Sequence, residues 1–182
     1  MTDPIDDLLD AAESGKSIIK NRIEEVKMEA LLAQMNPHFI FNAMNSIQKY
    51  ILENDSDNAV LFLGEFSKLI RKNLDHCTRP YISINEEIEY LNTYIYLENK
   101  RFDNNVLVEL KVDEAIDSYF MEIPSMIIQP FIENVFVHAF PPSVIAPKLN
   151  IDFSLVQEDI LVCTIKDNGV GISKPSKKIH KS

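Results

Sequence analysis

A histidine directly after a proline is the first feature of this sequence that could do chemistry. It lies in the segment Asn36-Pro37-His38-Phe39-Ile40-Phe41-Asn42. A proline inside a run with helical apolar spacing removes a backbone donor and kinks or breaks the helix, which can turn the next side chain toward solvent. A neutral imidazole presented in this way could attack a phosphoryl group near pH 7. An ordinary Asn-Pro turn beside a structural histidine is the alternative, and this segment alone favours it.

A second group of polar residues follows in the segment Glu133-Asn134-Val135-Phe136-Val137-His138-Ala139. Asn134 and His138 are four residues apart, so a helix would place them on one face. Polar groups on such an apolar helix are costly unless they have partners. An amide oxygen suits Mg²⁺, and a nearby carboxylate can orient an attacking group. The alternative is that these residues form only the hydrated side of an amphipathic helix.

The third motif, Asp167-Asn168-Gly169-Val170-Gly171, comes at the end of a predicted strand. Glycines allow the backbone to approach a planar ligand closely or to turn sharply. An aspartate at the base of such a pocket can accept a hydrogen bond from an exocyclic amine such as that of adenine. A plain Asn-Gly hairpin turn is the alternative.

Composition narrows the class of function. The chain has 182 residues and a net charge of -10, and this charge argues against binding to nucleic acid because no basic stripe would neutralise phosphates. No apolar run approaches the roughly 18 residues that span a bilayer. Cys77 and Cys163 form no CxxC motif, which favours reduced thiols in the cytosol. The four histidines show no metal-ligand spacing, so no structural metal is expected.

The first part of the chain is predicted to be helical. Residues 1–17 form an acidic lead-in, a helix covers 18–52, and a second helix covers 59–74 after a loop at 54–58. The start of the first helix fits either a coiled coil or a single amphipathic surface helix. Two helices joined by a short loop form an antiparallel hairpin, and the wide apolar face of the second helix predicts pairing with a second copy into a four-helix bundle.

The second part, residues 81–182, is predicted to mix helices and strands, which makes the fold class α+β. The Ser83-Ile84-Asn85-Glu86 segment is a capping box. It should begin a helix that runs to about Phe102 and buries Ile84, Ile88, Leu91 and Ile95. The other predicted elements are a strand at 106–112, a helix that opens at Glu122-Ile123-Pro124, bends at Pro130 and ends near Phe140, and antiparallel strands at 149–156 and 160–166. The two parts are predicted to divide near residue 80.

The order and spacing of the three motifs resemble one family. The sequence resembles the LytS-like sensor histidine kinases, whose catalytic half belongs to the GHKL ATPase superfamily. The resemblance rests on PHFIFN, a second helix, a capped helix ending in Lys100-Arg101-Phe102, and then ENVFVHA and DNGVGI. The resemblance covers roughly residues 31–172. It implies a dimerising helical hairpin at 18–80, followed by an incomplete GHKL-type α/β-sandwich ATP-binding domain at 81–182.

The resemblance also implies roles for individual residues. His38 would be the phosphoacceptor, Asn134 would coordinate Mg²⁺, and Glu133 would be the base or an orienting carboxylate. Better-known histidine kinases place an acid directly after the acceptor to orient its ring, and Phe39 stands there instead. The orienting group must therefore come from elsewhere, and Asn42 is also a candidate for positioning water during dephosphorylation.

For the nucleotide, the resemblance implies that His138 contacts a phosphate or the ribose and that Asp167 binds the adenine amine. Gly169 and Gly171 would shape the wall of the pocket. The cofactors would be ATP and Mg²⁺. The partners would be a second copy of the chain and a response regulator, of the LytTR type, that receives the phosphoryl group on an aspartate.

The chain departs from the family after the glycine motif, because the lid and the second glycine-rich box of GHKL kinases do not follow. We therefore expect this polypeptide, as given, to bind ATP weakly or not at all and to be inactive alone. The alternative function is a non-catalytic dimeric phosphoacceptor that another kinase phosphorylates in trans. The expected location is the cytoplasm, with any membrane anchor supplied by upstream segments.

Overall fold

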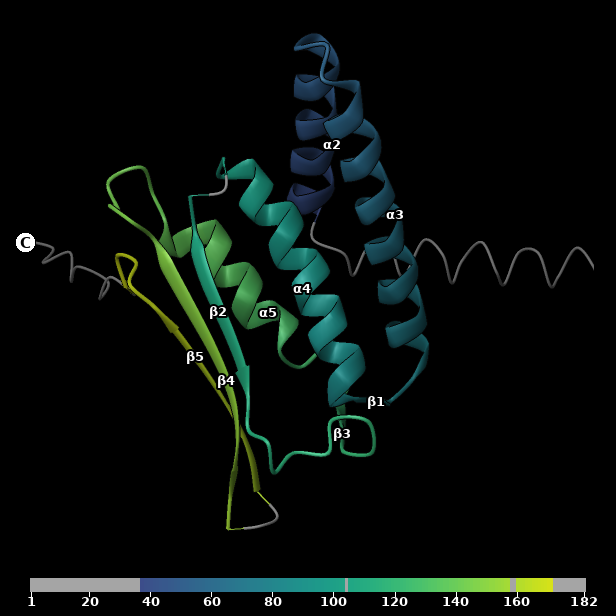
Figure 1. Cartoon of the computed structure of the whole chain (residues 1–182), viewed down its shortest axis with the longest axis vertical. Helices are drawn as coiled ribbons and strands as arrows, with labels where there is room; N and C mark the ends of the chain where they lie inside the picture. The colour runs from purple at the N-terminus through teal and green to yellow at the C-terminus, as the bar shows by residue number, and fades with distance from the viewer. Residues whose placement is uncertain (1–36, 104, 158–159, 172–182) are drawn as a thin grey trace, which may run out of the picture. The chain divides into compact units, whose positions relative to one another are not determined.

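The computed structural model describes residues 37–103, 105–157 and 160–171 (Figure 1). The chain divides into two compact units, Met1–Asn45 and Ser46–Ser182. Helix α2 (Pro37–Leu52) begins in the first unit and ends in the second, and all later elements belong to the second unit. The acidic lead-in and the predicted helix before residue 37 lie outside the described residues. The predicted functional division near residue 80 stays a prediction.

A tight turn joins the end of α2 to helix α3 (Ser56–Thr78). The Asp55 amide donates to the Tyr50 carbonyl at 2.9 Å, and the Asp55 carboxylate accepts from the Asn58 amide at 3.2 Å as the helix cap. Because Asp55 caps it, α3 starts earlier than the predicted residue 59, and it ends later than residue 74.

No helix in the described part of the chain is long and apolar enough to cross a membrane.

Helix α4 (Ile84–Arg101) begins with the predicted capping box. Burial of Ile84, Leu91 and Ile95 is confirmed, but the prediction for Ile88 is wrong, since Ile88 is only half-buried. The helix buries a wider stripe than predicted because α3 packs against one side of it and the apolar core on another. The additional buried residues of this stripe are Glu87, Tyr90, Tyr94, Leu97 and Glu98.

The capping box gives a direct test of how α4 is stabilised. Ser83 Oγ accepts from the Glu86 amide at 3.2 Å, and Glu86 Oε2 accepts from the Ser83 amide at 2.8 Å. We expect Ser83→Ala to lower the free energy of unfolding by about 1 kcal/mol, because it leaves helix N–H groups without a partner. Urea denaturation would measure this. Ser56→Ala, at an exposed position of α3, is the control; an equal loss in both variants would contradict the role of the cap.

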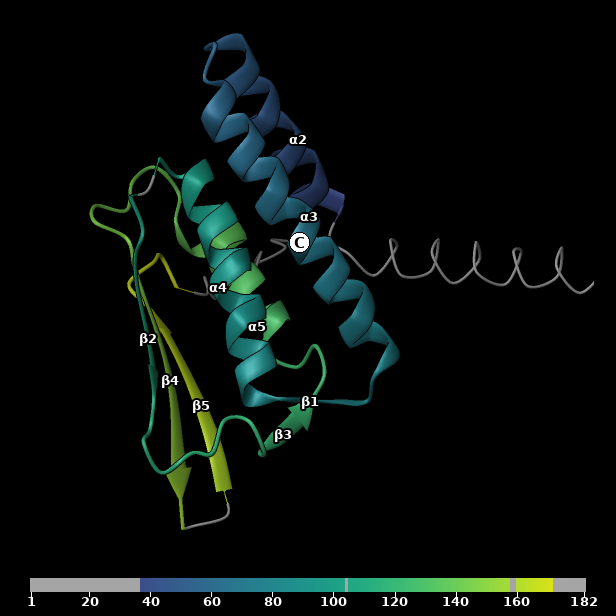
Figure 2. The same cartoon turned by 45° about the vertical axis from the view of Figure 1, so that its right-hand side comes forward.

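Three strands form the main sheet in the order β2 (Leu107–Val112), β4 (Lys148–Val156) and β5 (Ile160–Asp167). β2 and β4 are parallel, and β4 and β5 are antiparallel as predicted. Helices α4 and α5 (Gln129–Asn134) lie on one face of this sheet (Figures 1 and 2). Alternate residues of β4 face this helical layer and are buried, namely Leu149, Ile151 and Phe153. The α+β fold class is confirmed.

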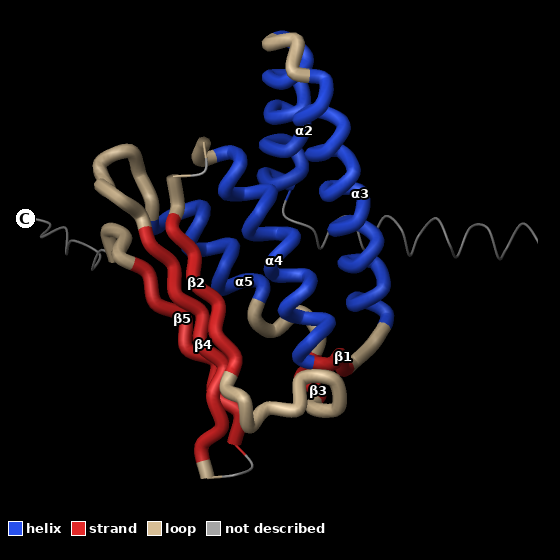
Figure 3. Tube along the Cα trace, viewed as in Figure 1, coloured by secondary structure: helices blue, strands red, loops and turns tan. Residues whose placement is uncertain are grey.

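The predicted helix start at Glu122–Pro124 is wrong. These residues form strand β3, which pairs antiparallel with β1 (Tyr81–Ser83) beside the start of α4 (Figure 3). Ile82 and Ile123 are opposite each other and both are buried, so tertiary burial favours the extended form. The helix starts instead at Gln129. Pro130 therefore lies in its first turn, where no amide hydrogen is needed, and does not bend a longer helix.

Candidate functional site

One cavity of the second unit is lined by residues from two of the three motifs. It measures about 470 Å³ and lies between the helix that carries Asn134 and His138 and the chain segment that carries Asp167 and Gly171. The other lining residues are Phe131, Val135, Ala139 and Ile165. A cavity of this size, with apolar walls and a few polar groups, is typical of sites for small molecules.

The helix side of the cavity changes its geometry at Asn134. α5 ends there and continues into the π-helical turn η1 (Val135–Ala139), which contains His138. A π turn is wider than an α turn, and such turns occur frequently at functional sites. Asn134 and His138 are both exposed side chains that line the same cavity. The helix thus presents an amide and an imidazole to the same space.

The glycine motif packs directly against the end of η1. The Val170 amide donates to the Ala139 carbonyl at 3.0 Å. A Cβ atom at Gly169 would collide with that carbonyl oxygen, so only glycine allows this approach. Gly171 has a φ of +68°, in the left-handed region that favours glycine. The motif therefore forms a wall of the cavity together with η1.

Side-chain hydrogen bonds fix the turn that holds Asp167. Asp167 Oδ1 accepts from the Gly169 amide at 2.9 Å, which uses one of its two carboxylate oxygens. Asn168 Oδ1 accepts from the Lys148 amide at 2.6 Å, and Asn168 Nδ2 donates to the Ala146 carbonyl at 3.0 Å. These bonds tie the turn to the start of β4. The spacing of Asn168 in the sequence predicts a turn and gives no signal of this contact.

Glu133 is not among the residues that line the cavity. Its Oε1 accepts from Gln129 Nε2 at 2.6 Å, and the side chain is half-buried. Burial is the main cause that raises the pKa of Tyr90 and Tyr94 on α4, and the negative charge of Glu133 adds to it for both. Gln129 was not among the residues predicted for the site, although a glutamine four residues before a glutamate is a recognisable helix pair.

His38 belongs to the first unit and is described by itself. It is exposed near the start of α2, and Asn42 Nδ2 lies 3.2 Å from His38 Nδ1. Asn42 is one helical turn further on, so its amide can hold the orientation of the ring. This contact involves the residue proposed from the sequence for positioning water, and it makes Asn42 a candidate for the orienting group that Phe39 cannot supply.

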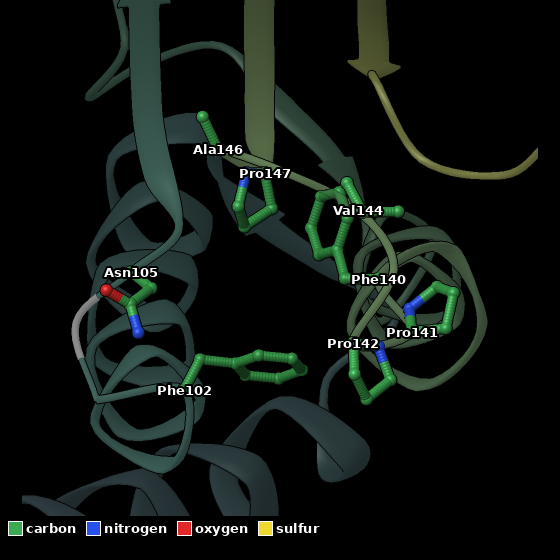
Figure 4. A pocket seen from close by; sticks show the side chains of 8 residues that line it. All are labelled: Phe102, Asn105, Phe140, Pro141, Pro142, Val144, Ala146 and Pro147. Carbon is green, nitrogen blue, oxygen red and sulfur yellow. The ribbon is translucent and has the colours of Figure 1, made fainter.

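A second cavity, of about 610 Å³, lies at the other end of α4 from the capping box, between Phe102 and the segment after η1 (Figure 4). Its lining consists of Phe102, Asn105, Phe140, Pro141, Pro142, Val144, Ala146 and Pro147. None of these side chains is ionisable, so this cavity offers no charged group to phosphates or cations. Among the described residues, no three histidine, cysteine, aspartate or glutamate side chains gather as a metal site. The first cavity is the better candidate.

Comparison with known proteins agrees with the motifs. A family model described as "Histidine kinase" matches residues 26–106. The chain is 32% identical over 162 residues to "Sensor protein LytS" of Bacillus subtilis and 33% identical over 161 residues to "Sensor protein LytS" of Enterococcus faecalis. These alignments cover 88% of this chain in both cases, and 26% and 27% of the two relatives. The chain belongs to the LytS-like sensor histidine kinase family.

A relative with a different name also matches most of the chain. "Sensor protein kinase HptS" of Staphylococcus aureus is 26% identical over 172 residues, which cover 91% of this chain and 32% of that protein. The chain thus spans about a quarter of the length of the LytS relatives it matches. The alignments link the chain to histidine kinases by family, and the kinase reaction itself is a proposal.

Proposed function

We propose that this chain is the core of a two-component sensor histidine kinase. It uses ATP and Mg²⁺ to phosphorylate His38 and then passes the phosphoryl group to an aspartate of a response regulator, of the LytTR type. The observation that carries the proposal is the single cavity that gathers Asn134, His138, Asp167 and Gly171 from two separate motifs. Membership of the LytS-like family supports the same reaction.

The cavity has groups suited to both ends of a nucleotide. At one end, Asp167 can accept a hydrogen bond from the adenine amine, and Phe131 and Ile165 supply apolar walls. At the other end, the Asn134 amide oxygen would hold Mg²⁺, and His138 would contact a phosphate. The close contact of Gly169 with η1 supports this fit because it brings the two ends together. The ion would neutralise charge on the phosphates.

In the proposed reaction, a bond forms between an imidazole nitrogen of His38 and the γ-phosphorus. The bond from that phosphorus to the bridging oxygen breaks, and ADP leaves with the electron pair. Such transfers depend mainly on positioning and charge neutralisation. Glu133 is proposed as the base or as an orienting carboxylate. An aspartate of the regulator then accepts the phosphoryl group and regenerates the imidazole.

The partners follow from the same proposal. Apolar side chains at the tip formed by the end of α2 and the start of α3 are exposed, and a groove there suits a second copy of the chain. They include Ile51, Leu52, Val60 and Leu63. Burial of this surface would stabilise a homodimer built as a four-helix bundle. A kinase that uses ATP and serves a response regulator would act in the cytoplasm.

Binding of the nucleotide tests the role of the cavity. We expect Asp167→Asn to weaken binding of a non-hydrolysable MgATP analogue about tenfold or more, because it removes the charged acceptor for the adenine amine. Calorimetry on the protein in its full natural length would measure the Kd. Asp152→Asn, at an exposed position on β4, is the matched control. Equal affinity of the wild type and Asp167→Asn would contradict the proposed adenine site.

A further inference from the structure

Helix α5 begins with few of the contacts that usually hold a first turn. Its cap residue, Ile128, has no side chain that can accept from the helix amides. Pro130 contributes no amide hydrogen. The Ile128 carbonyl accepts from the Phe131 amide at 3.0 Å and more distantly from the Ile132 amide at 3.4 Å. Side-chain contacts must therefore fix the rotation of this turn about the helix axis.

One side-chain pair spans this turn. Gln129 Nε2 donates to Glu133 Oε1 at 2.6 Å, across one helical turn. Gln129 is only 7% exposed, and its Oε1 has no hydrogen-bond partner among the described residues. A buried amide oxygen without a partner costs free energy, of order 1–3 kcal/mol. The site thus retains an unfavourable group together with a short bond to Glu133, which indicates that the bond has a role beyond packing.

We propose that Gln129 and Glu133 are positioning residues that act through Asn134. Their hydrogen bond fixes the rotation of α5, so that Asn134, the next residue, presents its amide to the cavity. The geometry agrees because Glu133 is bonded to Gln129 and lies outside the cavity lining, whereas Asn134 is part of that lining. The inference rests on the proposed function. A positioning carboxylate need not exchange a proton with His38. The inference therefore assigns Glu133 the orienting role and not the role of base.

Three variants distinguish a positioning role of the Gln129–Glu133 pair from an effect of the negative charge of Glu133. Gln129→Leu and Glu133→Leu both break the bond, whereas Glu133→Gln keeps an acceptor for Gln129 and removes only the charge. In the protein of full natural length, as for Asp167→Asn, we expect the two leucine variants to raise the Kd for a non-hydrolysable MgATP analogue about tenfold, and Glu133→Gln to stay within about threefold of the wild type. In an Asn134→Ala background, Gln129→Leu should have no further effect on the Kd, because the pair acts through Asn134.

The control is Asn150→Leu, which removes an exposed amide that donates to Glu109 at 3.0 Å on the sheet, and it should leave the Kd unchanged. Melting temperatures would show that each variant is folded at the temperature of the measurement. The inference fails if Glu133→Gln weakens binding as much as Glu133→Leu, if Gln129→Leu leaves the Kd unchanged, or if Gln129→Leu still weakens binding without Asn134. These measurements need no phosphoryl transfer. Failure of the kinase proposal would appear separately, as a wild type that binds nucleotide and never phosphorylates His38.

Discussion

Replacement of His38 by glutamine is expected to abolish autophosphorylation. Glutamine keeps a polar side chain on α2, but its amide nitrogen has no lone pair available for attack on phosphorus. The yield of acid-labile, base-stable phosphate should fall at least about a thousandfold. The measurement uses labelled ATP and Mg²⁺ with this chain and with the protein in its full natural length. His38 is exposed and bonded to Asn42, so the substitution should not disturb a core.

His180→Gln is the matched control, because it removes another histidine of the same chain and should keep full labelling. Affinity for the MgATP analogue should be the same in the wild type and in His38→Gln. Labelling that persists without His38 would show that the acceptor is another residue, as in a protein-serine kinase with a related ATP site. Labelling of His38 only when a complete kinase is added would favour the alternative of a phosphoacceptor that is modified in trans.

The second large effect is expected at Glu87, whose stability contribution depends on pH. This carboxyl is 1% exposed, and its Oε1 has no hydrogen-bond partner among the described residues. Burial raises the pKa of Glu87 to about 7, from an ordinary value of 4.5. The unfolded chain loses this proton near pH 4.5 and the folded protein keeps it until about pH 7, so the wild type loses stability as the pH rises through this interval. The total loss is about 3 kcal/mol.

Glu87→Gln removes the titration and keeps the shape. We expect it to match the wild type, or be slightly less stable, at pH 4.5, and to be more stable by about 3 kcal/mol at pH 7.5. Urea unfolding at a series of pH values would measure both proteins. Glu89→Gln on the same helix is the control. Its pKa is lowered, mainly by the hydrogen bond from Lys72, so it should not gain stability at high pH. A difference between wild type and Glu87→Gln that stays constant with pH would contradict the assignment.

Elements with strong local signals were predictable from the sequence. The capping box of α4 depends on residues three apart, and the alternation of β4 is visible within nine residues. The pairing of β1 with β3 was not predictable, because each strand has only three residues and the two are far apart in the sequence. The burial of Glu87 was missed for a related reason: a helix with two packed neighbours buries residues outside a single apolar stripe.

For the candidate site, the motifs predicted the polar residues and not the framework that holds them. Asn134, His138, Asp167 and Gly171 were named from their order and spacing, and the structure brings all four to one cavity. That Glu133 does not line the cavity and bonds to Gln129 could not be foreseen, because helix spacing alone does not say which neighbour a helix face meets. The contact of Gly169 with η1 depends on the path of the whole chain between them.

The contact of Gly169 with Ala139 has a consequence for how this protein can vary in evolution. The backbone of one motif touches the last residue of the other, and an added Cβ at Gly169 would meet both the carbonyl and the methyl group of Ala139. Two sites thirty positions apart in the sequence therefore share one small volume. A lineage that enlarges either side chain must move a helix end or a strand end to accommodate it. Substitution of Gly169 and Ala139 is thus limited by the space between them, whatever the chemistry of the cavity.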